Sequence, residues 1–125
     1  MDVEANKRAA VDFLAMVMAK RIDEAYAKHV DPKGRHHNAY FAAGMDNLRA
    51  AMKEAHDKNP ETAIFVKHVV GEGDLVAVHS HVKHAPAASG VAVVLIFRFQ
   101  AGKVVELWDI GQPVPADLPN KDGMF

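Results

Sequence analysis

The hydrophobic pattern of this 125-residue chain changes its period once, near Asn59-Pro60. Before that point, apolar residues recur at steps of three and four, which is the spacing of one face of an α-helix. After it, apolar and polar residues alternate or form short β-rich runs, which is typical of strands. Because the helices come first and the strands follow, the chain does not fit alternating βαβ units, and we expect an α+β fold.

Three helices are predicted in the first half. Asp2 can cap the first helix, and its pattern continues through Val11, Leu14, Met18, Ile22 and Ala25. The pattern breaks near residues 20–23 and resumes as a short second helix through Val30, which Asp31-Pro32 ends because the residue before a proline is pushed out of the α region. Residues 44–59 are predicted to be the third helix, with one face formed by Leu48, Ala51, Met52 and Ala55.

Four strands are predicted in the second half, at residues 64–70, 75–82, 91–99 and 104–110. The turn signals "GEGD" and "QAGK" and the loop "APAASG" separate them, so we expect a mainly antiparallel meander. The three helices must then cover one face of a curved sheet. The whole chain, residues 1–125, is expected to be one domain shaped as a cone with a mouth at one end.

Composition removes several classes of function. The chain has no cysteine, so disulfides, thiolate catalysis and cysteine-ligated metals are excluded. The net charge is -1 and the isoelectric point is near 6.7, which gives no basic field to attract nucleic acid or anionic lipid. No run approaches the roughly 20 apolar residues that cross a bilayer. We expect a cytoplasmic protein that binds neither nucleic acid nor membrane.

Histidine is the one unusual count, with eight in the chain. His36 and His37 stand side by side in the segment "GRHHNAYF", which is expected to be a loop before the third helix. His79 and His81 share one face of a predicted strand. With Asp109 they could supply nitrogen and oxygen ligands, but their spacing matches no metal motif, so we expect neither a metal nor another cofactor.

Several segments point to a family, namely "GRHHNAYF", "GDLVAVHSHV", "VVLIFRFQAGKVVELWDIGQPVP" and "NKDGMF". They resemble the SnoaL-like group of the nuclear transport factor 2-like superfamily, whose members often carry "Y-I-Q-H-N-P", "G-D-L-V-A-V-H-S", "G-K-I-V-E-H-W-D" and "N-x-x-G-M-F" at these places. The resemblance implies an α+β cone (a cystatin-like α+β barrel) with a deep pocket. It also implies acid/base enzymes, such as polyketide cyclases, ketosteroid isomerases and dehydratases, or non-catalytic binders.

Two departures from the family pattern make the expected pocket more apolar. Leu107 stands where the family has the histidine of "E-H-W-D", and Leu95 stands where a polar residue is common. Strand alternation places Leu107 and Asp109 on one face, with Glu106 and Trp108 on the other. These leucines favour a small hydrophobic ligand.

The predicted catalytic residues are Asp109, His37 and His79. Asp109 matches the aspartate of "W-D", and an apolar surround would raise its pKa and make it a better base for removing a proton next to a carbonyl. His37 matches the histidine of "Q-H-N-P" and is expected to point inward, with His36 at the surface. His79 matches "V-H-S" and could face the cavity, a subunit contact or solvent. Alternatively, Asp109 caps the turn that follows it, and the paired histidines cap the third helix or bond loop backbone.

Substrate binding is predicted for Asn38, Tyr26, Leu95, Leu107, His81, Phe97 and Trp108. Of these, Phe97 and Trp108 fit core or interface positions better than ligand contacts, and a single tyrosine at helical spacing, such as Tyr26, usually belongs to the core. The remaining histidines are expected to be solvated: His29, His56, His68 and His84. Arg98 is expected to pair with Glu106 across a hairpin.

The sequence therefore predicts a cofactor-independent enzyme that performs aldol cyclisation, isomerisation or dehydration on a small hydrophobic carbonyl compound. A non-catalytic binder of an apolar ligand, or an accessory protein with a vestigial pocket, are the alternatives. A homodimer formed through the exposed sheet face is also expected. The tail after residue 110 contains Pro113, Pro115 and Pro119, and it is either frayed or lays Met124 and Phe125 over an opening or a partner subunit.

Overall fold

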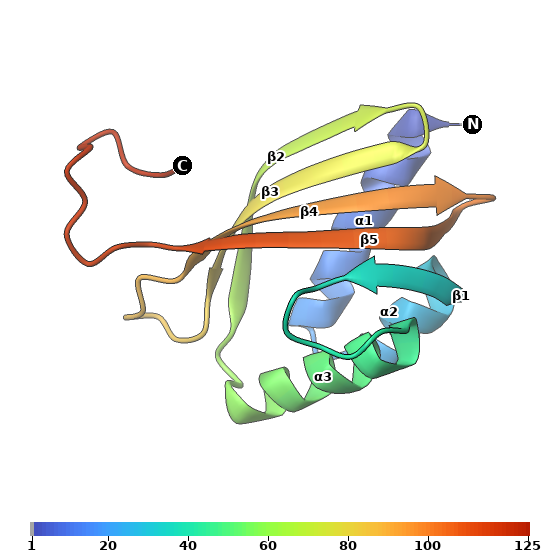
Figure 1. The fold of residues 1–125 in the computed structure, drawn as a ribbon, viewed down its shortest axis with the longest axis horizontal. Helices are drawn as coiled ribbons and strands as arrows, with labels where there is room; N and C mark the ends of the chain where they lie inside the picture. Colours follow the sequence, from blue (N-terminus) through green and yellow to red (C-terminus); the bar gives the residue numbers. More distant parts are fainter. Residues whose placement is uncertain (1) are drawn as a thin grey trace.

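The computed structural model describes residues 2–125 (Figure 1). The helices are α1 (Val3–Met18), α2 (Ile22–His29) and α3 (Met45–Lys58). The strands are β1 (Val30–His37), β2 (Ala63–Glu72), β3 (Leu75–Lys83), β4 (Val91–Gln100) and β5 (Lys103–Pro113). The three predicted helices and the four predicted strands are confirmed, and β1 is an additional strand.

Local signals explain where the helices begin and end. The Asp2 carboxylate accepts a hydrogen bond from the Ala5 backbone N–H at 3.1 Å and caps α1. Lys20, with a φ of 62°, lies in the left-handed region between α1 and α2, which is where the periodic pattern breaks. Pro60 lies just beyond the end of α3, and proline cannot continue a helix.

The strands form one sheet in the order β1-β5-β4-β3-β2. Strands β2 to β5 are an antiparallel meander, and β1 joins β5 in parallel. The helices cover one face of the sheet, with α1 behind β2 to β5 and α3 beyond β1 at the lower edge (Figure 1). We call the face toward the helices the inner face and the opposite face the outer face.

Residues 34–37 of the segment "GRHHNAYF", including both histidines, belong to strand β1, so the prediction of a loop was wrong for them. Residues 38–41 are a loop, as predicted. Strand β1 pairs Val30 with Val104 and His36 with Leu107. Gly34 lies against β5 so closely that a Cβ atom there would be 2.8 Å from the Val105 carbonyl oxygen. The local sequence is polar and carries a proline, which an edge strand with one neighbour tolerates. The pairing comes from β5, far along the chain.

The core lies between the inner face and the helices. Its largest fully buried side chains include Phe13, Phe97, Val17, Val76 and Val78. The Phe13 ring meets the rings of Tyr26 and Phe97 edge to face, with centroids 5.3 and 6.0 Å apart. Phe97 therefore serves the core rather than a binding site.

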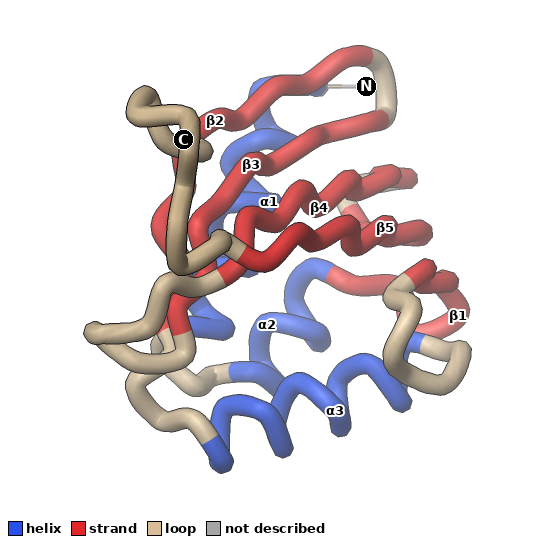
Figure 2. The backbone as a smooth tube through the Cα atoms, turned by 60° about the vertical axis from the view of Figure 1, so that its left-hand side comes forward, coloured by secondary structure: helices blue, strands red, loops and turns tan. Residues whose placement is uncertain are grey.

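The C-terminal tail folds back over the outer face of the sheet, near β2 and β3 (Figure 2). The Phe125 ring stacks on the rings of His81 and His79, with centroids 4.3 and 5.6 Å apart. The Lys67 ammonium lies 5.7 Å from the centre of the Phe125 ring. Of the predicted alternatives, a strap fits better than a frayed end, but the strap covers histidines of its own chain.

Among residues 2–125, no helix combines the length and the apolar character that crossing a bilayer requires.

Candidate functional site

A cleft of about 140 Å³ opens on the inner side of the sheet, against α3. We call it the Asp109 cleft. Most of its wall is apolar, and its lining comprises Asn38, Phe41, Leu48, Ala51, Met52, Ala55, His56, Thr62, Ile64, Val82, His84 and Asp109. It is far smaller than the deep pocket that the family resemblance implied.

Asp109 is half-buried in this cleft and shares the inner face with Leu95, its partner on β4. Burial raises the pKa of the Asp109 carboxyl above its ordinary value, and a hydrogen bond from Asn38 opposes the rise. The Asn38 amide nitrogen donates this bond to Asp109 Oδ2 over 2.8 Å. The Asn38 bond therefore engages Oδ2 and not Oδ1. The burial around Asp109 makes its carboxylate more basic.

The orientation of Asn38 is fixed by its neighbours. Its amide oxygen accepts a hydrogen bond from the Tyr40 backbone N–H at 2.9 Å, so the amide nitrogen must face Asp109. The buried His36 ring accepts from the Asn38 backbone N–H at Nδ1 and donates from Nε2 to the Ala42 carbonyl, at 3.1 and 2.8 Å. His36 therefore holds the start of the loop that presents Asn38.

The predicted orientation of the histidine pair is reversed in the structure. His36 is buried, and His37 is exposed on the outer face. The reason is strand alternation, because β1 pairs His36 with the buried Leu107 and His37 with Trp108. His37 stacks on the Trp108 ring and bonds Glu106 at 2.7 Å, so it does not reach the Asp109 cleft.

His79 and His81 are also on the outer face. The ladder sets Val78, Leu95 and Asp109 in one row on the inner face, and the row that contains His79 faces the other way. The Nδ1 atoms of His79 and His68 are 2.9 Å apart, and His81 bonds the Ser89 carbonyl oxygen at 2.7 Å. The predicted catalytic trio of Asp109, His37 and His79 is therefore not brought together.

Two of the histidines predicted to be solvated are in fact buried. His29 bonds Asp12 at 2.7 Å. His56 lines the Asp109 cleft, and burial lowers the pKa of its imidazole, which favours the neutral form. A signal for His56 was present in the sequence, because Leu48, Met52 and His56 are spaced four residues apart on one helix face. His68 and His84 are exposed, as predicted.

Tyr26 reaches from α2 toward α3 and is buried. Within residues 2–125, the hydrogen bond of its hydroxyl goes to the Met52 sulfur at 3.8 Å, a weak acceptor. Burial raises the pKa of the Tyr26 phenol well above its ordinary value; the charge of Arg49 opposes this rise, and the smaller effect of Asp109 adds to it. The Tyr26 hydroxyl thus stays protonated and can donate a hydrogen bond, and it lies beside Met52 of the Asp109 cleft.

The other predicted binding residues occupy different places. Leu107 is buried in the core, and Leu95 packs against that core. Trp108 is on the outer face, where the Arg98 guanidinium lies 5.6 Å from its ring centre. The predicted pair of Arg98 and Glu106 is present at 3.6 Å.

Within the part of the chain that the structure describes, no three His, Cys, Asp or Glu side chains come together as a ligand set for a metal ion.

The raised pKa of Asp109 predicts an unusual effect on stability. A carboxyl whose pKa is higher in the folded than in the unfolded state destabilises the fold once pH rises through both values. We expect Asp109→Asn to raise the melting temperature at pH 7, because it removes the buried charge and retains an oxygen for Asn38. Below the range in which the carboxyl titrates, the two melting temperatures should converge; a lower value for the variant at pH 7 would contradict the assignment.

Comparison with known proteins places the chain in a family. The family model of the SnoaL-like domain matches residues 10–107. The chain therefore belongs to the SnoaL-like domain family, within the nuclear transport factor 2-like fold. A search among curated proteins finds no significant match.

Solved structures agree with the fold at low sequence identity. Bal32a, from a soil-derived mobile gene cassette, superposes with a TM-score of 0.76 at 13% identity, over 87% of this chain and 90% of its own. A protein provisionally assigned as a SnoaL-like polyketide cyclase from Jannaschia sp. CCS1 gives 0.74 at 20% identity, over 88% and 87%. One provisionally assigned as a ketosteroid isomerase from Kribbella flavida DSM 17836 gives 0.72 at 15% identity, over 97% and 87%.

Proposed function

We propose that this protein is a cofactor-independent enzyme of the SnoaL-like family that removes a proton from the carbon next to the carbonyl of a small hydrophobic compound. The observation that supports this best is Asp109, a half-buried carboxylate of raised pKa in an apolar cleft. Such surroundings bring a carboxylate toward the basicity that proton abstraction needs. The neighbours provisionally assigned as a cyclase and an isomerase are compatible with this class of chemistry.

The proposed step uses two side chains. Asp109 Oδ1 takes the proton from the α-carbon, and the electron pair of that C–H bond forms the carbon–carbon double bond of an enolate, leaving the charge on the carbonyl oxygen. Asn38 Nδ2 carries two hydrogens, and one is bonded to Asp109. The second is available to the enolate oxygen, since the bond from Tyr40 holds the amide in this orientation. If a further carbon–carbon double bond is conjugated with the enolate, reprotonation at its far carbon gives isomerisation. Attack of the α-carbon on a second carbonyl, whose oxygen then takes up a proton, gives cyclisation.

Deuterium exchange tests this proposal without knowledge of the natural substrate. Cyclohexanone incubated in D₂O with the protein should gain deuterium at its α-carbons faster than with buffer alone, as followed by proton NMR. Exchange at the buffer rate, at protein and ketone concentrations where binding is seen, would contradict the proposed chemistry.

A non-catalytic binder is the second candidate. It is favoured by the apolar walls of the Asp109 cleft, such as Leu48 and Ile64. A binder would take up cyclohexanone without accelerating exchange, so the same experiment separates the two functions.

We also propose that two copies associate through the outer face. Val70, Ile110 and Phe65 are large apolar residues there, with exposed fractions of 64%, 57% and 48%. Their exposure on one sheet face indicates an association surface. Light scattering should give twice the 13.6 kDa mass of the chain, and a clean monomer would refute the proposal.

A further inference from the structure

The size of the Asp109 cleft limits what it holds. Its volume of about 140 Å³ is close to the roughly 150 Å³ of an engineered apolar cavity that binds benzene. Typical ligand sites measure about 300–1,000 Å³. In the conformation seen here, the cleft therefore takes one six-membered ring and little more.

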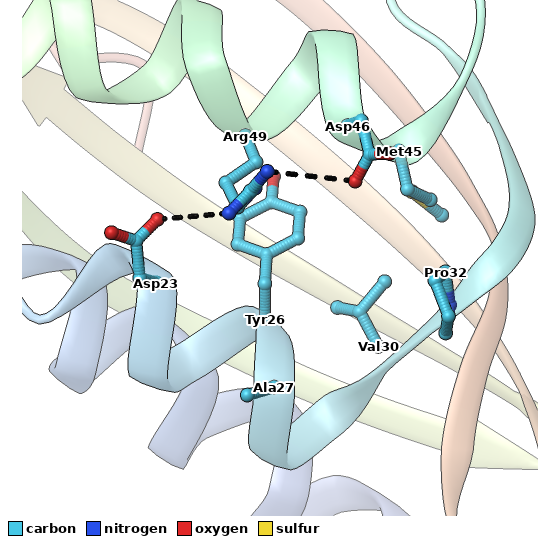
Figure 3. A pocket seen from close by; sticks show the side chains of 8 residues that line it. All are labelled: Asp23, Tyr26, Ala27, Val30, Pro32, Met45, Asp46 and Arg49. Atoms are coloured by element: carbon cyan, nitrogen blue, oxygen red, sulfur yellow. Dashed lines mark hydrogen bonds and ion pairs between the residues drawn. The ribbon is translucent and has the colours of Figure 1, made fainter.

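A second cleft, of about 300 Å³, lies between α2, β1 and α3 (Figure 3). We call it the Tyr26 cleft. Its apolar wall includes Val30, Pro32 and Met45. At its rim, the Arg49 guanidinium joins Asp23 and Asp46, at 3.2 and 3.6 Å (Figure 3).

A contact between two side chains links the two clefts. Met52 lines the Asp109 cleft, Tyr26 lines the other, and the Tyr26 hydroxyl bonds the Met52 sulfur. Methionine is unbranched and adapts its shape readily, and its sulfur is a poor hydrogen-bond acceptor. Because the phenol has this weak partner in a buried site, a ligand oxygen would be a better one.

We propose that Met52 determines the length of the substrate that reaches Asp109. Displacement of its side chain joins the two clefts, so the site accepts a two-ring ketone. The carbonyl next to the reacting carbon lies at Asp109 and Asn38, and an oxygen on the distal ring receives the Tyr26 hydrogen bond. This proposal rests on the proposed function, because that function makes the Asp109 cleft the ligand site.

The test uses binding, so that it does not depend on turnover. The probes are cyclohexanone, 1-decalone and decalin-1,5-dione, and affinities come from titrations followed by ¹⁵N–¹H NMR spectra. Met52→Ala should bind 1-decalone at least tenfold more tightly than the natural protein does, while the affinity for cyclohexanone changes less than threefold. Leu48→Ala is the matched control, because Leu48 also lines the Asp109 cleft but is not the residue that bonds the Tyr26 hydroxyl.

The role of the phenol is tested in the Met52→Ala background. Adding Tyr26→Phe should weaken binding of decalin-1,5-dione at least fivefold and leave that of 1-decalone within twofold, because only the dione carries the distal oxygen. If Met52→Ala does not fold, Met52→Val replaces it under the same criteria.

Any of three results would overturn the proposal. The first is an equal gain in 1-decalone affinity for Met52→Ala and Leu48→Ala, the second is no gain for Met52→Ala, and the third is that none of the three ketones binds. If the gain appears and wild-type exchange does not, the proposed function fails while the role of Met52 stands.

Discussion

Replacing Asp109 by asparagine is expected to reduce the rate of α-deuterium incorporation into cyclohexanone by about 10²–10⁴-fold, the range that a positioned general base contributes. Asparagine has nearly the same shape and still offers an oxygen to Asn38, but it cannot accept the proton. The loss should therefore be in the rate at saturating ketone, with binding little changed. Proton NMR in D₂O measures the rate, and the ¹⁵N–¹H titration measures the affinity.

Asp117→Asn is the matched control, since Asp117 is an exposed carboxylate in the tail. It should exchange at the wild-type rate. If Asp109→Asn keeps more than a tenth of the wild-type rate, Asp109 is not the base, whatever the control shows.

The largest effect on stability is expected from Phe97→Ala. Phe97 is 1% exposed and meets the rings of Phe13 and Phe99. Removing a buried phenylalanine ring leaves a cavity, and the free energy of unfolding should fall by about 3–5 kcal/mol. Urea denaturation measures this loss.

Trp108→Ala removes a larger ring from the outer face and is the comparison. Because Trp108 is only partly buried, its loss should lower the free energy of unfolding by less than half as much. An equal or greater loss for Trp108→Ala would contradict the description of where the core lies.

The elements with strong local signals could be predicted from the sequence. The α-helical period of residues 44–59 and the alternation of residues 75–82 correspond closely to α3 and β3. Strand β1 could not be predicted in this way, because its residues "VDPKGRHH" carry no apolar alternation. Its extended form depends on the parallel contact with β5, which is distant in sequence.

The candidate site was predicted in part. Asp109 and Asn38 were identified by their motifs, and the structure joins them by a hydrogen bond. The predicted orientation of His36 and His37 is reversed in the structure, because strand alternation fixes the direction of each side chain and the sequence predicts a loop there. Strand alternation correctly predicted that His79 and the buried Val78 lie on opposite faces of the sheet. A motif match alone could not show that Asp109 lies on the same face as Val78.

The proposed function depends on Asp109 acting as a base of raised pKa inside the cleft. The most direct measurement compares two titrations on the same protein: the ¹³C NMR shift of the Asp109 carboxyl carbon against pH, and the rate of α-deuterium exchange of cyclohexanone against pH. We expect a carboxyl midpoint above the ordinary aspartate value and an exchange rate that rises with pH through that same midpoint. A midpoint at or below the ordinary value, or an exchange rate that does not follow the carboxyl titration, would contradict it.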